Sequence, residues 1–319
     1  MTQTTAPAGT ATPKAKAKQR AGDIWFSGSA LFAGSMILAT LAAVAIFLVI
    51  QSLPAFGADS TTASLLTTNF WDYVWPLLFG TIWAALLALV MAVPLSLGVA
   101  LFITHYAPRR LAQSLGYVVD LLAAVPSVVF GLWGILVLAP AVQPTYTWLN
   151  QNMGWFPLFA GDVSATGRTI FTAAIVLAVM VVPIITAICR EIFLQTPRLH
   201  EEAALALGAT RWEMIRMAVL PFGRSGIVSA SMLGLGRALG ETMAVAMVLS
   251  ATGTVTLQLF TSTNPSTIAA NIALTFPEAY DVNINVLIAT GLILFIVTFA
   301  VNALARWIVS RRKEFSGAN

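Results

Sequence analysis

A series of long apolar stretches, separated by short polar segments, constrains this chain more than any other feature. Crossing the roughly 30 Å hydrocarbon core of a bilayer takes an α-helix of about 20 residues. Six stretches reach that length. Hydrophobic residues make up 58% of the sequence and charged residues only 9%, whereas about a quarter of a soluble domain is charged. These proportions exclude a disordered protein, a nucleic-acid-binding protein and an ordinary water-soluble enzyme. They predict an all-α polytopic membrane protein with six transmembrane helices, over residues 29–50, 77–104, 117–141, 169–194, 227–250 and 286–307.

The distribution of basic residues predicts how these helices are oriented. Fifteen of the seventeen Lys and Arg residues lie in the N-terminal tail, near the cytoplasmic ends after spans two and four, or at the C-terminal end. The segments on the opposite side contain Arg168 as their only basic residue. Because cytoplasmic segments carry the excess of Lys and Arg, we expect both termini in the cytoplasm. The same asymmetry explains the net charge of +4 without a nucleic-acid partner.

The rarest residue types exclude several kinds of site. None of the four lysines follows the glycine-rich loop of a P-loop, so we expect no ATP or GTP hydrolysis by that route. The single cysteine, Cys189, cannot form an intrachain disulfide or a multi-cysteine zinc site. The sequence therefore predicts no catalytic residue, no cofactor and no metal site in this chain.

The polar segment 198–221 predicts two short helices joined by a tight turn. Gly208 suits the left-handed residue that ends a helix, and Thr210 with Glu213 has the spacing of a capping box for the second helix. Pro221 is expected to end that second helix. Between two membrane spans, such a hairpin is either a simple amphipathic surface loop or a docking element for a cytoplasmic partner.

The first helix of this hairpin has two different faces. Leu199, Ala203 and Leu207 fall on one face, and Glu201 and Glu202 are turned away from it. We expect both apolar and acidic surface to be exposed.

Two charged residues in the fifth span, Arg237 and Glu241, are the candidate substrate-pathway residues. Each costs about 2.5–3.5 kcal/mol in the bilayer. Being four residues apart in one helix, they share a face and can pair. The guanidinium group offers a planar fork of donors suited to oxyanions such as phosphate, with Glu241 keeping it oriented. The alternative is an ion pair that only fixes helix packing. Gly236 and Gly240 would let another helix, or a substrate, approach closely.

Several segments resemble the permeases of ABC importers. A Glu-Ala-Ala triplet, a glycine and a Leu-Pro pair are similar to the EAA signature of that family, although Ala218 stands where isoleucine is common. Segment 234–244, Gly-Leu-Gly-Arg-Ala-Leu-Gly-Glu-Thr-Met-Ala, resembles the PstC-type permeases of phosphate-uptake importers, as do segments 93–100 and 120–131. The residues that match the signature are Glu202, Ala203, Ala204, Gly208, Leu220 and Pro221.

The resemblance implies a type I ABC importer permease fold and a set of partners. The signature residues would form a coupling helix that docks into a groove of an ATPase subunit. The chain would pair with a PstA-type permease and work with two PstB-type ATPases, which bind the ATP, and an external PstS-type phosphate-binding protein. It would move inorganic phosphate by alternating access across the plasma (inner) membrane of a prokaryote.

The expected domain organisation follows from these assignments. Residues 1–24 form a disordered basic cytoplasmic tail, whose lysines serve as a topology signal or touch anionic membrane lipid. Residues 25–73 hold the first transmembrane helix and an external loop. Residues 74–310 form the ABC type I transmembrane domain, with its coupling hairpin at 198–221, and residues 311–319 form a cytoplasmic tail.

Residue chemistry leaves three alternatives open. An arginine binds sulfate or molybdate as well as phosphate, so the first alternative is a permease of the same kind of importer for another oxyanion. A secondary transporter or channel would work without ATPase partners. A structural membrane scaffold would need neither Arg237 nor Glu241.

Overall fold

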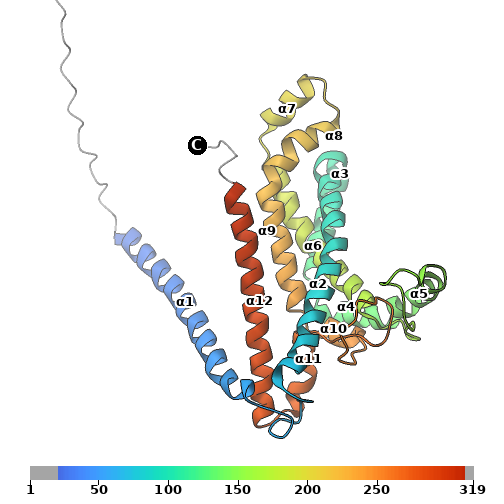
Figure 1. Ribbon diagram of the computed structural model, residues 1–319. Helices are drawn as coiled ribbons and strands as arrows, with labels where there is room; N and C mark the ends of the chain where they lie inside the picture. Colours follow the sequence, from blue (N-terminus) through green and yellow to red (C-terminus); the bar gives the residue numbers. More distant parts are fainter. Residues whose placement is uncertain (1–20, 313–319) are drawn as a thin grey trace, which may run out of the picture. The chain divides into compact units, whose positions relative to one another are not determined.

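The computed structural model describes residues 21–312. Helices make up all the regular structure in this range, where the only strand-like features are three isolated β-bridges. Within the described range the chain divides into two compact units, one ending at Phe47 and the other beginning at Leu48. In chain order (Figure 1) the helices are α1 (Ala21–Phe56), α2 (Phe70–Leu101), the π-turn η1 (Phe102–Tyr106), α3 (Arg109–Ala123), α4 (Ser127–Trp133), the π-turn η2 (Gly134–Leu138), α5 (Ala139–Met153), α6 (Ile170–Leu194), α7 (Arg198–Ala206), α8 (Arg211–Met214), the π-turn η3 (Ile215–Val219), α9 (Leu220–Leu239), α10 (Met243–Val248), α11 (Ile268–Thr275), the 3₁₀-turn η4 (Phe276–Glu278) and α12 (Val282–Arg312).

The two expected tails fall mostly outside the described residues. Helix α1 begins at Ala21, so the last four residues of the expected tail 1–24 are helical. At the other end, positions 311 and 312 belong to α12.

Six helices are long and apolar enough to cross a membrane, which confirms the predicted number of spans. They run Trp25–Phe56, Phe70–Tyr106, Ser127–Met153, Ile170–Leu194, Arg211–Leu239 and Val282–Trp307. Two of the predicted spans are not continuous helices, so their predicted ranges were wrong. The third, over 117–141, is interrupted between α3 and α4, where Pro126 precedes the new helix and has no N–H to continue the old one. The fifth, over 227–250, is interrupted after Leu239.

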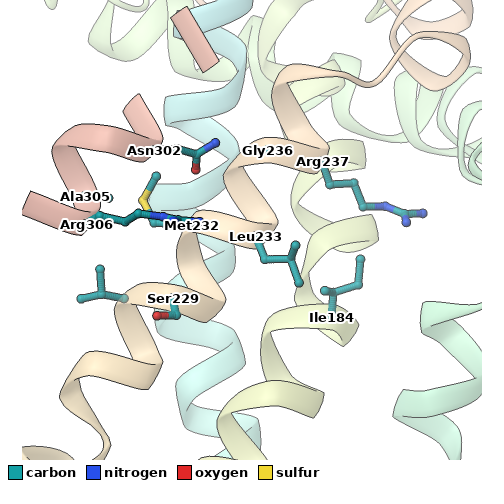
Figure 2. A pocket seen from close by; sticks show the side chains of 10 residues that line it. Ile184, Ser229, Met232, Leu233, Gly236, Arg237, Asn302, Ala305 and Arg306 are labelled. Carbon is teal, nitrogen blue, oxygen red and sulfur yellow. The ribbon is translucent and has the colours of Figure 1, made fainter. Parts of the chain in front are cut away.

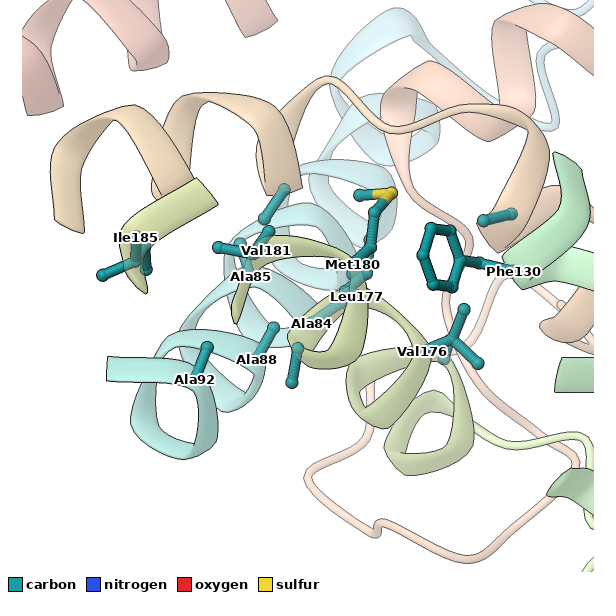
Figure 3. Close-up of a cluster of buried hydrophobic side chains, with 14 of the residues drawn as sticks. Ala84, Ala85, Ala88, Ala92, Phe130, Val176, Leu177, Met180, Val181 and Ile185 are labelled. Carbon is teal, nitrogen blue, oxygen red and sulfur yellow. The ribbon is translucent and has the colours of Figure 1, made fainter. Parts of the chain in front are cut away.

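The core of the second unit is the packing of α6 against α2. Figure 3 shows alanine side chains of α2 facing the larger side chains of α6. Small residues let two helices approach closely, which is the main source of helix association in lipid. The hydroxyl of Ser96 donates to the backbone carbonyl of Val182 at 3.2 Å, adding a polar contact to the same seam. The buried alanines are Ala84, Ala85, Ala88 and Ala92.

Helix α9 lies on another side of α6, and a glycine brings them together. A Cβ atom at Gly234 would lie 2.6 Å from Cγ1 of Val181 and 2.8 Å from Cδ1 of Ile185. The two helices therefore run in close contact where Gly234 meets α6. This places α9, which carries Arg237, on the most rigid part of the unit.

The two glycines Gly80 and Gly98 of α2 provide a matched test of how α2 packs against the segment that precedes α11. A Cβ atom at Gly80 would overlap the backbone carbonyl of Ser266, whereas at Gly98 nothing lies within 4 Å. We expect Gly80→Ala to destabilise the protein by about 1–3 kcal/mol through overpacking. Gly98→Ala should be neutral or stabilising by about 0.5–1 kcal/mol, because alanine favours the helix. Thermal unfolding of the detergent-solubilised protein measures both, and equal melting temperatures for the two variants would contradict the packing described.

Candidate functional site

The hairpin between α6 and α9 has the local structure that its sequence predicts. Gly208 follows α7 with a φ of 87°, in the left-handed region that favours glycine. Thr210 and Glu213 form the predicted capping box: the Thr210 hydroxyl accepts from the backbone N–H of Glu213 at 3.3 Å, and the Glu213 carboxylate accepts from the backbone N–H of Thr210 at 2.8 Å. The turn between α7 and α8 is thus stabilised from both sides.

The prediction that Pro221 ends the second hairpin helix was wrong. Helix α8 continues through the π-turn η3 into α9, giving one helical segment, Arg211–Leu239. The wider turn closes with the N–H of Leu220 bonded to the carbonyl of Ile215. Pro221 therefore lies inside this segment, directly after the π-turn, which lets the helix continue past a residue that has no N–H to donate. The hairpin is therefore joined to Arg237 by a continuous helix.

The hairpin exposes several large apolar side chains among charged ones such as Arg198, Glu202 and Arg211. Leu207 is 90% exposed and Leu199 75% exposed, and Trp212 beside them is also open. Of the signature alanines, Ala203 is exposed, whereas Ala204 is half-buried against the core. Apolar side chains held out at the tip of a protruding hairpin suit a docking surface.

Glu201 faces the membrane helices, a contact that the sequence did not predict. Its carboxylate lies 3.6 Å from Nε2 of His105, which belongs to η1 at the end of α2. Nδ1 of the same imidazole lies 2.6 Å from the hydroxyl of Thr104. Nearly a hundred residues separate the histidine from the glutamate, so no local pattern could have revealed the pair. It ties α7 to α2 from the side opposite the exposed leucines.

A second charged group lies at the same end of the bundle. Arg190 of α6 approaches Asp120 of α3 at 3.5 Å and Glu191 at 3.2 Å. Its guanidinium occupies the space that a side chain at position 116 would need, which explains Gly116. These contacts link α3 to α6 beside the hairpin.

Arg237 lies in the last turn of α9 and lines a cavity of about 890 Å³. The cavity is bounded mainly by α9, with Ile184 from α6 and residues of α12. Figure 2 shows the Arg237 side chain pointing away from α12, on the side of Ile184. Within the described range 21–312, Arg237 forms no ion pair and no hydrogen bond. Its guanidinium group is available to a ligand.

The predicted pairing of Arg237 with Glu241 was wrong. Helix α9 ends at Leu239, so the two residues do not share a helical face. The Glu241 side chain, only 8% exposed, accepts instead from the backbone N–H of Ala244 at 3.0 Å. It caps the start of α10, where a negative charge also suits the helix dipole.

At the other end of α10, Arg168 donates to the carbonyl of Met247 at 3.1 Å. The short helix after the break is thus held at both ends by charged side chains. This fixes the direction in which the chain leaves α9, and with it the position of Arg237.

Gly236 and Gly240, the two glycines beside Arg237, do not contact a neighbouring helix among the described residues. No atom lies within 4 Å of a Cβ built at Gly236, and Gly240 meets only the carbonyl of Gly236. Gly236 lines the same cavity as Arg237 and leaves its backbone open there. Within this chain it is Gly234, and not Gly236 or Gly240, that brings a neighbouring helix close.

Two variants at Glu241 distinguish its role as a helix cap from a role that depends on its charge. Glu241→Gln keeps an oxygen that accepts from Ala244, so we expect little loss of stability. Glu241→Ala removes the cap and should cost about 0.5–2 kcal/mol. Thermal unfolding of the two variants distinguishes these outcomes, and equal destabilisation by both would favour a role that depends on the charge.

Comparison with known proteins agrees with this architecture. The family described as "Binding-protein-dependent transport system inner membrane component" matches residues 92–314. "Phosphate transport system permease protein PstC 2" of Mycobacterium tuberculosis is 49% identical, covering 91% of this chain and 92% of its own length. "Phosphate transport system permease protein PstC" of Mesorhizobium japonicum is 38% identical, covering 93% and 92%.

Two solved structures share the fold. A chain of a bacterial alginate ABC transporter, in complex with an alginate-pentasaccharide-bound periplasmic protein, has a TM-score of 0.61 at 17% identity and covers 91% of this chain and 95% of its own. A bacterial ABC transporter involved in alginate import has a TM-score of 0.59 at 17% identity, covering 90% and 98%. The predicted ABC importer permease fold and the resemblance to PstC-type permeases are confirmed. The chain belongs to the family of binding-protein-dependent transport system inner membrane components.

Proposed function

We propose that this chain is the membrane permease subunit of an ATP-driven importer that moves inorganic phosphate by alternating access. The names of its relatives support phosphate as the substrate. The observation that carries the proposal is the guanidinium group of Arg237, which lines a cavity and has no carboxylate partner within the described residues.

An arginine without a carboxylate partner suits a transport path, in which the anion must bind and then be released. A guanidinium group stays charged and binds oxyanions through a planar fork of donors. Transport requires binding that is favourable enough for entry and weak enough for release. Arg237 is exposed, has no carboxylate partner among the described residues and lies beside the open backbone of Gly236, an arrangement that meets both conditions.

The hairpin 198–221 would couple the permease to ATP hydrolysis on another subunit. Leu199, Leu207 and the signature residues Glu202, Ala203 and Gly208 present its exposed surface. Ala204, Leu220 and Pro221 join that surface to the membrane helices. Because Arg211–Leu239 is one helical segment, a displacement of the hairpin passes along α9 to Arg237. The contact between His105 and Glu201 would carry the same displacement to α2.

The proposed assembly contains this chain, a PstA-type permease, two PstB-type ATPases that bind the ATP and an external PstS-type phosphate-binding protein. The membrane is the plasma (inner) membrane of a prokaryote. Both termini would lie in the cytoplasm, on the side of the hairpin, because the basic residues concentrate there. This chain would contribute shape changes and an anion path, with no covalent chemistry of its own.

Removing the charge of Arg237 tests the anion path. A hydrogen bond to a charged group contributes about 1.5–3 kcal/mol, so we expect Arg237→Gln to lower phosphate uptake about ten- to a hundredfold. Arg237→Lys keeps the charge but not the fork and should fall between. Uptake of labelled phosphate in cells measures the effect, with the amount of protein in the membrane determined separately.

Normal phosphate uptake by an Arg237→Gln variant that is present in the membrane at normal amount would remove this residue from the path. Uptake of labelled sulfate and molybdate, measured alongside, separates phosphate from the other oxyanions.

A change at the tip of the hairpin tests docking. Leu207 is 90% exposed, so Leu207→Asp should leave the fold intact. Placing a charge in an apolar interface should prevent the ATPase subunit from copurifying with the permease and abolish coupled transport. Leu207→Met keeps an apolar side chain and serves as the control. An Asp variant that retains the ATPase as well as the unchanged protein does would show that docking occurs elsewhere.

A further inference from the structure

We propose that Arg306 and Asn302 of α12, together with Ser229 of α9, form a second binding station for the phosphate anion, in the same cavity as Arg237. The inference rests on the proposed function, because it assigns further residues to the path of that substrate. All three residues line the cavity of about 890 Å³.

The polar residues of α12 lie on one helical face. Asn302 and Arg306 are four residues apart, and Ala305 between them is 8% exposed in the contact with neighbouring helices. Figure 2 shows the Arg306 side chain extending from α12 toward Met232 of α9. Its charge therefore lies over α9, and α12 directs two groups rich in hydrogen-bond donors into one cavity.

Among residues 21–312, no ion pair or hydrogen bond engages the side chain of Arg306 or Asn302. The Ser229 hydroxyl donates to the carbonyl of Ser225 at 3.0 Å and keeps its lone pairs. A guanidinium group, an amide and a hydroxyl are the set that binds the several oxygens of a phosphate, in both its protonated and deprotonated positions.

The arrangement places two arginines at different points of one path. Ser229 and Arg237 are eight residues apart on α9, which corresponds to about 12 Å along a helix. Figure 2 shows Arg306 extending toward α9 from the side of α12, whereas Arg237 extends away from α9 on the side of Ile184, so they do not form one tight site. Two separate, weak sites allow an anion to move from one to the next, whereas one strong site would hold it.

The simplest competing explanation is that Arg306 is only a basic residue at the end of a span, extending toward the membrane surface. That explanation does not require Asn302, one turn further into the span, or any effect of Arg306 on the cavity beside Ser229. The two explanations therefore differ in the electrostatic potential inside the cavity.

The experiment uses cysteine labelling in the complete importer, reconstituted with its partner permease and ATPases in liposomes. The only native cysteine, Cys189, is fully buried, so Ser229→Cys adds a single accessible thiol of nearly unchanged size. The rates of modification by an anionic and a cationic methanethiosulfonate are compared. With Arg306 present, we expect the anionic reagent to be favoured and inorganic phosphate to slow the labelling.

Arg306→Gln in this background should lower the ratio of anionic to cationic rates about three- to tenfold, remove the protection by phosphate and reduce phosphate transport. Arg216→Gln is the matched control. It removes the same charge from the same chain at a position 13 residues away, beyond a Debye length of about 8–10 Å, and should leave the ratio unchanged. Asn302→Leu should remove protection by phosphate with little effect on the ratio.

A ratio that does not depend on Arg306 would overturn the second station, as would a ratio that depends on Arg306 without any protection by phosphate. Absence of phosphate uptake by the unchanged complete importer would instead overturn the proposed function. Because uptake by the unchanged importer is measured in the same liposomes, the two failures are distinguishable.

Discussion

The close packing of α6 against α2 is the contact on which the rest of the second unit depends. Lipid gives apolar helices no hydrophobic reason to associate, so close approach and interhelical hydrogen bonds must supply the stability. The alanines of α2 and the Ser96–Val182 hydrogen bond provide both. Helix α9 then joins α6 at Gly234, and α3 joins α6 through the ion pair between Arg190 and Asp120. The helix that carries Arg237 is therefore positioned by the best-packed part of the unit.

A second constraint governs the places where helices stop. Backbone groups freed within a membrane need a partner in the protein or in water. The break after α9 is stabilised by Glu241, which caps α10, and by Arg168, which binds the carbonyl of Met247. The π-turn before Pro221 has the opposite effect to a break, because it lets a helix continue past a residue that has no N–H to donate. The π-turn lies at the hairpin end of the helical segment that carries Arg237, and the capped break lies just beyond Arg237 at the other end of that segment.

Two sets of charged residues in this unit have different tasks. At the hairpin end, the contact of His105 with Glu201 and the ion pair of Arg190 with Asp120 hold elements together. In the cavity, Arg237 and Arg306 have no such partner among the described residues. Charges that are paired stabilise contacts between helices, and charges that are left unpaired in a cavity remain free to bind an anion. This division supports a path for phosphate that is separate from the coupling contacts.

Local sequence patterns were sufficient for the number of spans, the hairpin turn at Gly208 and the Thr210–Glu213 capping box. Each of these depends on composition or on residues within one or two helical turns. The partner of Glu241, the continuation of the helix through Pro221, the contact of His105 with Glu201 and the shared cavity of Arg237 and Arg306 were decided by the tertiary structure. They depend on where a helix breaks and on which distant segments then meet. A capping bond or a wide turn differs in free energy from its alternatives by only about 1–2 kcal/mol. Packing between distant helices outweighs that difference, and local sequence does not reveal it.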